Sequence, residues 1–214
     1  MTEQRMTIGD HNVVIQNTGN DVTIAVGASS LTLVRRHLLK AAPRNEREVL
    51  LTELRATDLI GRNGDLASLE AWLNDPRPIA FRCLIGRGGA GKTRLGIEIC
   101  ERAEAADWIA GFATQAELQR FADAKNPQAW HWGKPTLAVV DYAAGAARTL
   151  LPWLEALARR VPEPKEGRLR LLLLERHADP ALGWWADLMR PGGLSGRGPE
   201  DLAAPNHELS GERA

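Results

Sequence analysis

Glycines, a lysine and a threonine lie close together in one short segment, which reads Gly86-Arg87-Gly88-Gly89-Ala90-Gly91-Lys92-Thr93. Their spacing is that of a Walker A motif, which follows a strand and opens a helix. Glycines let backbone amides approach phosphate oxygens without a Cβ in the way, and the helix start adds the positive end of a dipole. We expect Lys92 to reach the β- and γ-phosphates, and the Thr93 hydroxyl to coordinate Mg²⁺. The segment therefore predicts a site for a nucleoside triphosphate and magnesium.

An acid follows the apolar run at residues 137–140, in the position of a Walker B aspartate. A phosphate loop needs such an acid at the end of a neighbouring strand to hold the magnesium shell, and we assign that role to Asp141. Aspartates also follow strands as helix caps, so the assignment depends on the Walker A match. The next residue is Tyr142, where many hydrolytic P-loop proteins carry a second acid that polarises the attacking water. Nucleotide binding is thus better supported than catalysis.

A further candidate is Arg176, which follows the apolar run at residues 169–174. An arginine at the carboxyl end of a strand lies beside the ligand crevice of an open α/β sheet, where it can sense a γ-phosphate. The alternative is a solvated arginine paired with Glu175 or Asp179, which contributes little.

Strand and helix patterns alternate around these residues. Strands are predicted at residues 79–85, 108–113, 136–140 and 169–174, and helices at residues 95–103, 116–122 and 148–160. The strands are too apolar to have a face in water, which is typical of a parallel sheet covered on both sides. We therefore predict an α/β fold of the P-loop NTPase type, a three-layer sandwich with a mostly parallel sheet, over residues 58–190.

The rest of the chain has weaker patterns. Residues 1–30 hold two β-branched runs around a Gly/Asn/Asp turn, which predicts a β-hairpin or two rungs of a small repeat. A lone hairpin is marginal in water, so it must lean on the chain, on another copy or on a partner, unless it is a mobile extension. Residues 31–57 are predicted to be a helical connector, and residues 191–214 a loop, a tail or a truncated lid.

Composition excludes some classes of partner. Lysines plus arginines number 27, as do aspartates plus glutamates, so no net positive field indicates nucleic acid. The cysteines, Cys83 and Cys100, lie in apolar patterns and predict small core residues in a reduced compartment. The sequence has neither a secretion signal nor an apolar run long enough to span a bilayer, so we expect a cytoplasmic protein without a membrane partner.

Four segments together resemble the STAND NTPases, signalling ATPases related to the NACHT, NB-ARC and AAA+ groups. These segments are residues 59–62, 86–95, 139–143 and 171–176. The resemblance implies that Ile60, Gly61 and Arg62 lie along the nucleotide base and that Arg176 is the first sensor arginine. It also implies that the loop contacts to the nucleotide come from Gly86, Gly88, Gly89, Ala90, Gly91, Lys92, Thr93 and Arg94.

By that resemblance, the chain is an ATP-binding signalling switch with slow or conditional hydrolysis, self-associating or recruiting a partner protein through its N-terminal segment. Many bacterial members resemble conflict or antiphage defence proteins. Family members continue into a lid and sensor repeats, whereas this sequence stops at Ala214, so we expect a fragment, a truncated member or one completed by a partner. The alternatives are a small P-loop kinase, whose arginine-rich lid would be limited here to Arg190 and Arg197, and a catalytically inactive nucleotide-binding scaffold. The absence of a guanine-reading Asn/Thr-Lys-x-Asp motif favours ATP.

Overall fold

The computed structural model describes eight segments of the chain. They are residues 4–8, 13–18, 20–26, 29–36, 61–124, 130–161, 167–190 and 197–209. Two of the sequence predictions fall outside these segments, namely most of the helical connector and the assignment of Ile60 to the nucleotide base. Among the described helices, none is both long enough and apolar enough to cross a membrane.

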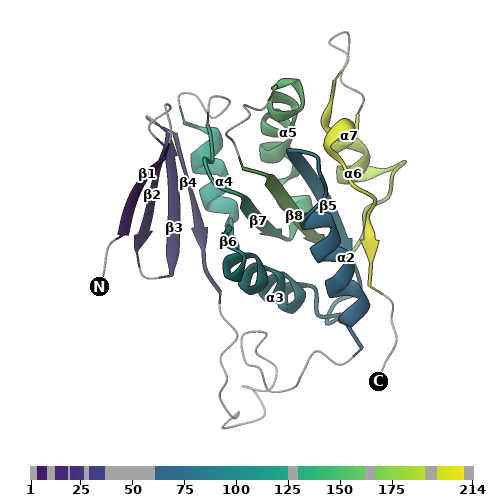
Figure 1. The fold of residues 1–214 in the computed structure, drawn as a ribbon. Helices are drawn as coiled ribbons and strands as arrows, with labels where there is room; N and C mark the ends of the chain where they lie inside the picture. Colours follow the sequence, from purple (N-terminus) through teal and green to yellow (C-terminus); the bar gives the residue numbers. More distant parts are fainter. Residues whose placement is uncertain are drawn as a thin grey trace.

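The strands that carry the predicted site form the parallel half of one sheet (Figure 1). They are β5 (Ile79–Ile85), β6 (Ile109–Phe112), β7 (Thr136–Asp141), β8 (Leu169–Glu175) and β9 (His207–Glu208). Their spatial order is β6-β7-β8-β5-β9, and every neighbouring pair is parallel. The predicted α/β fold with a parallel sheet is confirmed for this half.

Helices cover both faces of this half because successive strand residues point to opposite sides. On β7, Ala138 and Val140 join one buried cluster while Leu137 and Val139 join the other. The helices are α2 (Asn63–Leu73), α3 (Lys92–Ala105), α4 (Gln115–Ala122), α5 (Ala143–Arg159), α6 (Gly183–Leu188) and α7 (Pro199–Leu202). Helices α2 and α3 pack into one cluster, and α4, α5 and α6 into the other. Cys83 and Cys100 are buried free thiols, one in each cluster, and burial raises the pKa of both.

Helix α5 begins at Ala143, earlier than the predicted start at residue 148. Its first turns present small alanines to the core, and Ala143 and Ala146 are buried. Hydrophobic periodicity built from alanines is faint in a sequence, which is why the prediction started later. The early start places the N-terminus of α5 directly after Asp141.

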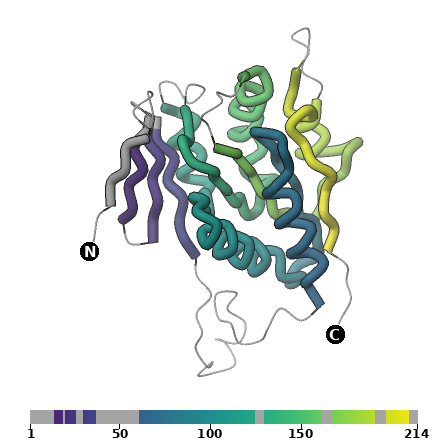
Figure 2. Tube along the Cα trace, viewed as in Figure 1, coloured from purple at the N-terminus to yellow at the C-terminus, as the bar shows by residue number. Residues whose placement is uncertain are grey.

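Four antiparallel strands extend the sheet on its other side. They are β1 (Gln4–Ile8), β2 (Val13–Thr18), β3 (Asp21–Val26) and β4 (Ser29–Val34). The predicted hairpin is β2 with β3, and two further strands flank it. The order of the whole described sheet is β1-β2-β3-β4-β6-β7-β8-β5-β9. Figure 2 shows the purple N-terminal strands and the yellow C-terminal segment on opposite sides of the molecule.

Strand β4 contradicts the helical connector predicted for its residues. Leu31 and Leu33 are fully buried while Thr32 and Val34 are not, which is the two-residue alternation of a half-buried strand. Leu31 lies opposite Ile24, so β4 completes the apolar face that the hairpin begins.

The antiparallel half packs against the rest of the chain, which was one of the four outcomes left open by the sequence. Its ladder with the parallel half is a single residue pair, Val34 with Phe112. Side chains supply the other contacts, since the Trp130 indole donates to the Ile24 carbonyl at 3.0 Å and Glu117 accepts from the Thr32 amide at 2.6 Å. Buried Trp130 thereby packs against the apolar face of these strands.

Residues 197–209 also differ from the predicted loop or tail, since they contain α7 and β9. Strand β9 pairs with the end of β5, and the Leu209 amide donates to the Ile85 carbonyl at 2.8 Å. A strand this short has no periodic signature in the sequence, and its pairing comes from tertiary contacts.

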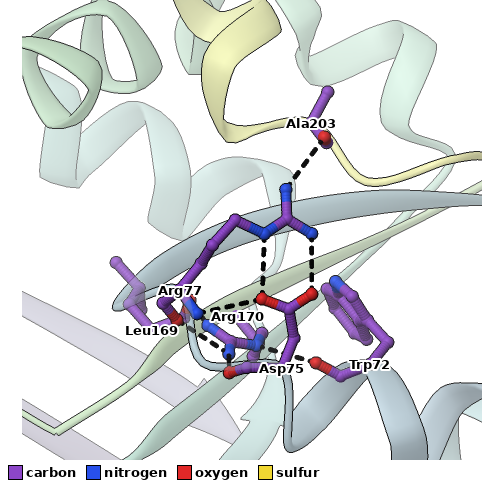
Figure 3. Close-up of polar contacts among 6 residues, drawn as sticks. All are labelled: Trp72, Asp75, Arg77, Leu169, Arg170 and Ala203. Atoms are coloured by element: carbon purple, nitrogen blue, oxygen red, sulfur yellow. Dashed lines mark hydrogen bonds and ion pairs between the residues drawn. The ribbon is translucent and has the colours of Figure 1, made fainter.

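A buried arginine fixes the base of the parallel half (Figure 3). Arg170 on β8 is fully buried, and burial lowers its pKa to about 10. Its guanidinium donates to four backbone carbonyls, those of Trp72, Asp75, Arg77 and Leu169. The neighbouring Arg77 pairs with Asp75 at 2.9 Å and donates to the Ala203 carbonyl at 3.2 Å. One cluster thus joins the end of α2, the entry to β5, β8 and the C-terminal segment.

Candidate functional site

The glycine-rich loop spans residues 86–91, between the end of β5 and the start of α3. Gly89 and Gly91 have φ values of 76° and 88°, in the left-handed region that favours glycine. A Cβ added at either position would meet no protein atom within 4 Å, so the loop has open space there. Gly91 is the N-cap of α3, which directs the free amides of the first turn toward that space.

Lys92 is the first residue of α3 and folds back over the loop. Its Nζ donates to the Gly86 carbonyl at 2.5 Å and to the Arg87 carbonyl at 3.0 Å. Burial lowers the pKa of Lys92, and the negative charges of Asp141 and Glu175 oppose that shift. The ammonium therefore lies within the loop and within the field of both acids.

The next residue joins the loop to the predicted magnesium acid. The Thr93 hydroxyl donates to Asp141 Oδ2 at 2.9 Å, so the two predicted magnesium ligands are brought together. Asp141 was predicted to end the strand next to the loop strand β5. That prediction is wrong, because β8 lies between β7 and β5. The pair forms because the loop at residues 86–91 leads from the end of β5 to the first turn of α3, where the Thr93 hydroxyl reaches Asp141 at the end of β7.

A hydroxyl and a carboxylate suit Mg²⁺, which prefers oxygen ligands and is usually held by one or two carboxylates together with substrate phosphates. No group of three or more His, Cys, Asp or Glu side chains that could hold a metal occurs in the described part of the chain. Thr93 and Asp141 therefore fit an ion that is completed by phosphate and water, and not an ion caged by protein alone.

Arg176 lies against the loop from β8. A Cβ added at Gly88 would come within 3.6 Å of Arg176 Nη2, which places the guanidinium beside that glycine. The alternative from the sequence was a solvated ion pair with Glu175 or Asp179. Among the described residues, the guanidinium has no such ion pair, and Glu175 Oε1 instead accepts the Arg176 backbone amide at 2.7 Å.

The segment before α2 reaches the same loop. Arg62 Nη2 donates to the Ala90 carbonyl at 3.2 Å, while Nη1 pairs with Asp65 at 3.0 Å. The other oxygen of Asp65 contacts His207 Nε2 of β9 at 2.6 Å. A chain of polar contacts thus runs from the C-terminal strand to the loop. No sequence pattern predicts a role for His207 here, because its contact with Asp65 spans 142 positions.

The remaining predicted site residues lie on or next to the loop. Gly61 precedes Arg62 with a φ of 73°, and Arg94 is half-buried in the first turn of α3. Gly86 is packed closely, because a Cβ there would lie 3.2 Å from the Cβ of Leu209 and 3.3 Å from that of Ala90. Strand β9 therefore supports the loop from behind.

Tyr142 occupies the bend between β7 and α5. It has φ 55° and ψ 51°, a left-handed conformation that is uncommon for a bulky residue, and its side chain is 66% exposed. Its amide donates to Asp141 Oδ1 at 3.0 Å, and its carbonyl accepts from Gln115 Nε2 at 3.3 Å. The strained bend thus orients the Asp141 carboxylate.

Glu175 is the functional candidate that the sequence analysis treated only as a partner for Arg176. It ends β8, between the strand of the loop and the strand of Asp141. Its Oε2 accepts the Ala144 amide at 3.1 Å, in the first turn of α5. The rule that selected Asp141, an acid at the carboxyl end of an apolar strand, would also have selected Glu175.

Neither the known protein-family models nor the curated proteins include a match to this chain. The geometry alone therefore describes the site. The cations Lys92, Arg176 and Arg62 lie against a glycine-rich loop, and the acids Asp141 and Glu175 lie near its lysine. This arrangement suits a polyanion that carries a divalent cation.

Proposed function

We propose that the chain binds Mg²⁺-ATP at residues 86–94 and acts as a STAND-type, nucleotide-dependent signalling switch on a P-loop NTPase fold. The observation that carries the proposal is the hydrogen bond between Thr93 and Asp141, which joins the Walker A threonine to the Walker B acid across an intervening strand. A glycine-rich turn without a ligand has no need of that pairing.

Each residue has a role in this proposal. The loop amides and the N-terminus of α3 bind the phosphates. Lys92 exchanges its two carbonyl acceptors for phosphate oxygens, Thr93 and Asp141 hold magnesium, and Arg176 contacts the γ-phosphate. Magnesium, when bound, neutralises charge on the β- and γ-phosphates.

Signalling would follow from how the loop is connected to the rest of the chain. Arg62 and Asp65 connect the Ala90 carbonyl to His207. A change in the loop on nucleotide binding would therefore alter the contacts of His207 in β9. We propose that the antiparallel half serves in self-association or partner recruitment, and that the pathway is one of bacterial defence.

A catalytically inactive scaffold is the second candidate, favoured by the exposed Tyr142 in the place of a second acid. It differs from the switch only in turnover. Phosphate release from Mg²⁺-ATP, measured without an added acceptor, therefore separates the two functions.

The binding proposal is tested by titrating a fluorescent ATP analogue into the purified chain with Mg²⁺. Lys92→Ala removes a charged contact to phosphate, so we expect affinity to fall by about a hundredfold. Lys134→Ala is the matched control, because Lys134 pairs with Asp107 at the amino end of the parallel strands and not at the loop. Equal affinity in the wild type and the Lys92 variant, or no binding by the wild type, would contradict the proposal.

A further inference from the structure

We infer that Glu175 is the general base that activates water for ATP hydrolysis, in place of the acid that Tyr142 does not supply. The inference rests on the proposed function, and it assigns to this site a catalytic group from β8 instead of from β7.

The position of Glu175 supports this role. Glu175 lies opposite Ile85 in the sheet, and its carbonyl accepts the Gly86 amide at 3.2 Å, so its backbone adjoins the first residue of the loop. On the other side, Leu174 lies opposite Asp141. Glu175 is therefore the acid at the middle of the site, between the phosphate loop and the magnesium acid.

The surrounding charges also support this role. The negative charges of Asp141 and Glu175 act to raise the pKa of Lys92, and the positive charge of Arg176 acts to lower it. Lys92 and Arg176 are the residues proposed to bind the γ-phosphate. The Glu175 carboxylate therefore lies close enough to Lys92 to act on its charge, beside a residue proposed to bind the γ-phosphate.

Hydrogen bonds hold the Glu175 carboxylate in place. Oε2 accepts the Ala144 amide at 3.1 Å, and Oε1 accepts the Arg176 amide at 2.7 Å. An ionised carboxylate has about four acceptor positions, so these two bonds fix its orientation and leave lone pairs for a water molecule.

The reaction is the transfer of a phosphoryl group to water. The water oxygen forms a bond to the γ-phosphorus while the bond from that phosphorus to the bridging β–γ oxygen breaks. One water proton passes to the Glu175 carboxylate and then to solvent, and the products are ADP and inorganic phosphate. Lys92 and Arg176 would balance the charge on the leaving group, together with a magnesium ion held by Thr93 and Asp141.

A merely structural role for Glu175 would be to cap α5. The two roles differ in what glutamine preserves, because Glu175→Gln keeps a carbonyl oxygen that can accept the Ala144 amide but cannot take up a proton. Glu175→Ala loses both. If Glu175 is a base, the two variants should lose similar amounts of turnover. If it is only a cap, the alanine variant should lose much more.

The experiment measures phosphate release at saturating Mg²⁺-ATP, the Kd for the fluorescent analogue and the melting temperature. Glu175→Gln should lower turnover by at least about a hundredfold, the usual contribution of general base catalysis, with Kd within about threefold of the wild type. Glu175→Ala should match it within a few fold. Glu155→Gln, which breaks only a surface pair with Arg159, is the matched control.

The outcomes separate the two proposals. Absence of binding by the wild type overturns the proposed function and this inference with it. Binding by the wild type with no turnover overturns the inference and favours the inactive scaffold over the switch. Turnover retained in Glu175→Gln overturns the inference alone. Turnover that falls together with affinity, or only in Glu175→Ala, shows a cap and also overturns it.

Discussion

The two halves of the sheet are held together in different ways. In the parallel half, β8 pairs along its length with both β5 and β7, so the ladder is continuous beneath the loop. Between the halves, β4 meets β6 at one residue pair. Every described residue of the candidate site belongs to the parallel half or to its C-terminal extension, and none comes from β1, β2, β3 or β4.

Because of this difference, we expect the site and the antiparallel half to be separable. The halves are joined by side-chain contacts and by a close approach at Gly111, whose position leaves 3.0 Å between an added Cβ and the Val34 carbonyl oxygen. Changes at the junction should release the N-terminal strands and leave the site intact. Changes at the base of β8 should destabilise both.

The largest expected effect is on Arg170. Arg170→Met leaves four buried carbonyls without their donor, and we expect it to lower the free energy of unfolding by about 3–5 kcal/mol. Urea unfolding measures the loss. Arg168→Met, an exposed change two residues earlier, is the control and should be nearly neutral. A small loss for Arg170→Met would mean that the cluster does not fix the parallel half.

A smaller effect is expected at the junction. Gly111→Ala places a Cβ against the Val34 carbonyl and the Leu33 side chain, and overpacking of this kind costs about 1–3 kcal/mol. Amide exchange should quicken in β3 and β4 while ATP affinity stays unchanged. Gly64→Ala, where no atom lies within 4 Å, is the control for adding a methyl group. Loss of ATP binding in Gly111→Ala would refute the separability of the halves.

The smallest effect concerns Asp75, whose pKa is lowered to about 2, chiefly by hydrogen bonds from the Arg77 side chain. A carboxyl group with a folded-state pKa below its unfolded value stabilises the protein above about pH 4 and loses that contribution as the pH falls toward 2. Asp75→Asn should therefore cost about 1 kcal/mol near pH 7, and the difference from the wild type should vanish near pH 2.

Chemical denaturation at a series of pH values measures this prediction. Asp187→Asn, which breaks an exposed pair with Arg190, should show no such dependence. A cost for Asp75→Asn that persists at pH 2 would assign the effect to packing instead of charge.

Local patterns predicted much of the parallel half. The strands at β5, β7 and β8 are apolar throughout, and the loop motif has a fixed spacing, so their places follow from the residues themselves. The pairing of Thr93 with Asp141 was also expected, because both belong to one magnesium site. Their separation by β8 was not, because strand order is set by how the connecting helices pack and not by local sequence.

The contacts that the sequence did not predict link distant positions or depend on small residues. Strand β9 is two residues long and forms only because β5 offers an edge for Leu209 to cover. Strand β4 was not predicted because its residues were grouped with the leucines and basic residues that follow, as one helical connector. Glu175 was overlooked because it was considered only as an ion-pair partner for Arg176. Its carboxylate instead accepts hydrogen bonds from backbone amides.

We propose that the parallel half binds Mg²⁺-ATP at the loop, independently of the antiparallel half. The sharpest test is amide hydrogen exchange of the whole chain, with and without Mg²⁺-ATP. We expect protection to rise at residues 86–94 and at the ends of β7 and β8, and to stay unchanged in β2 and β3. Protection confined to the antiparallel strands, or none anywhere at saturating nucleotide, would contradict it.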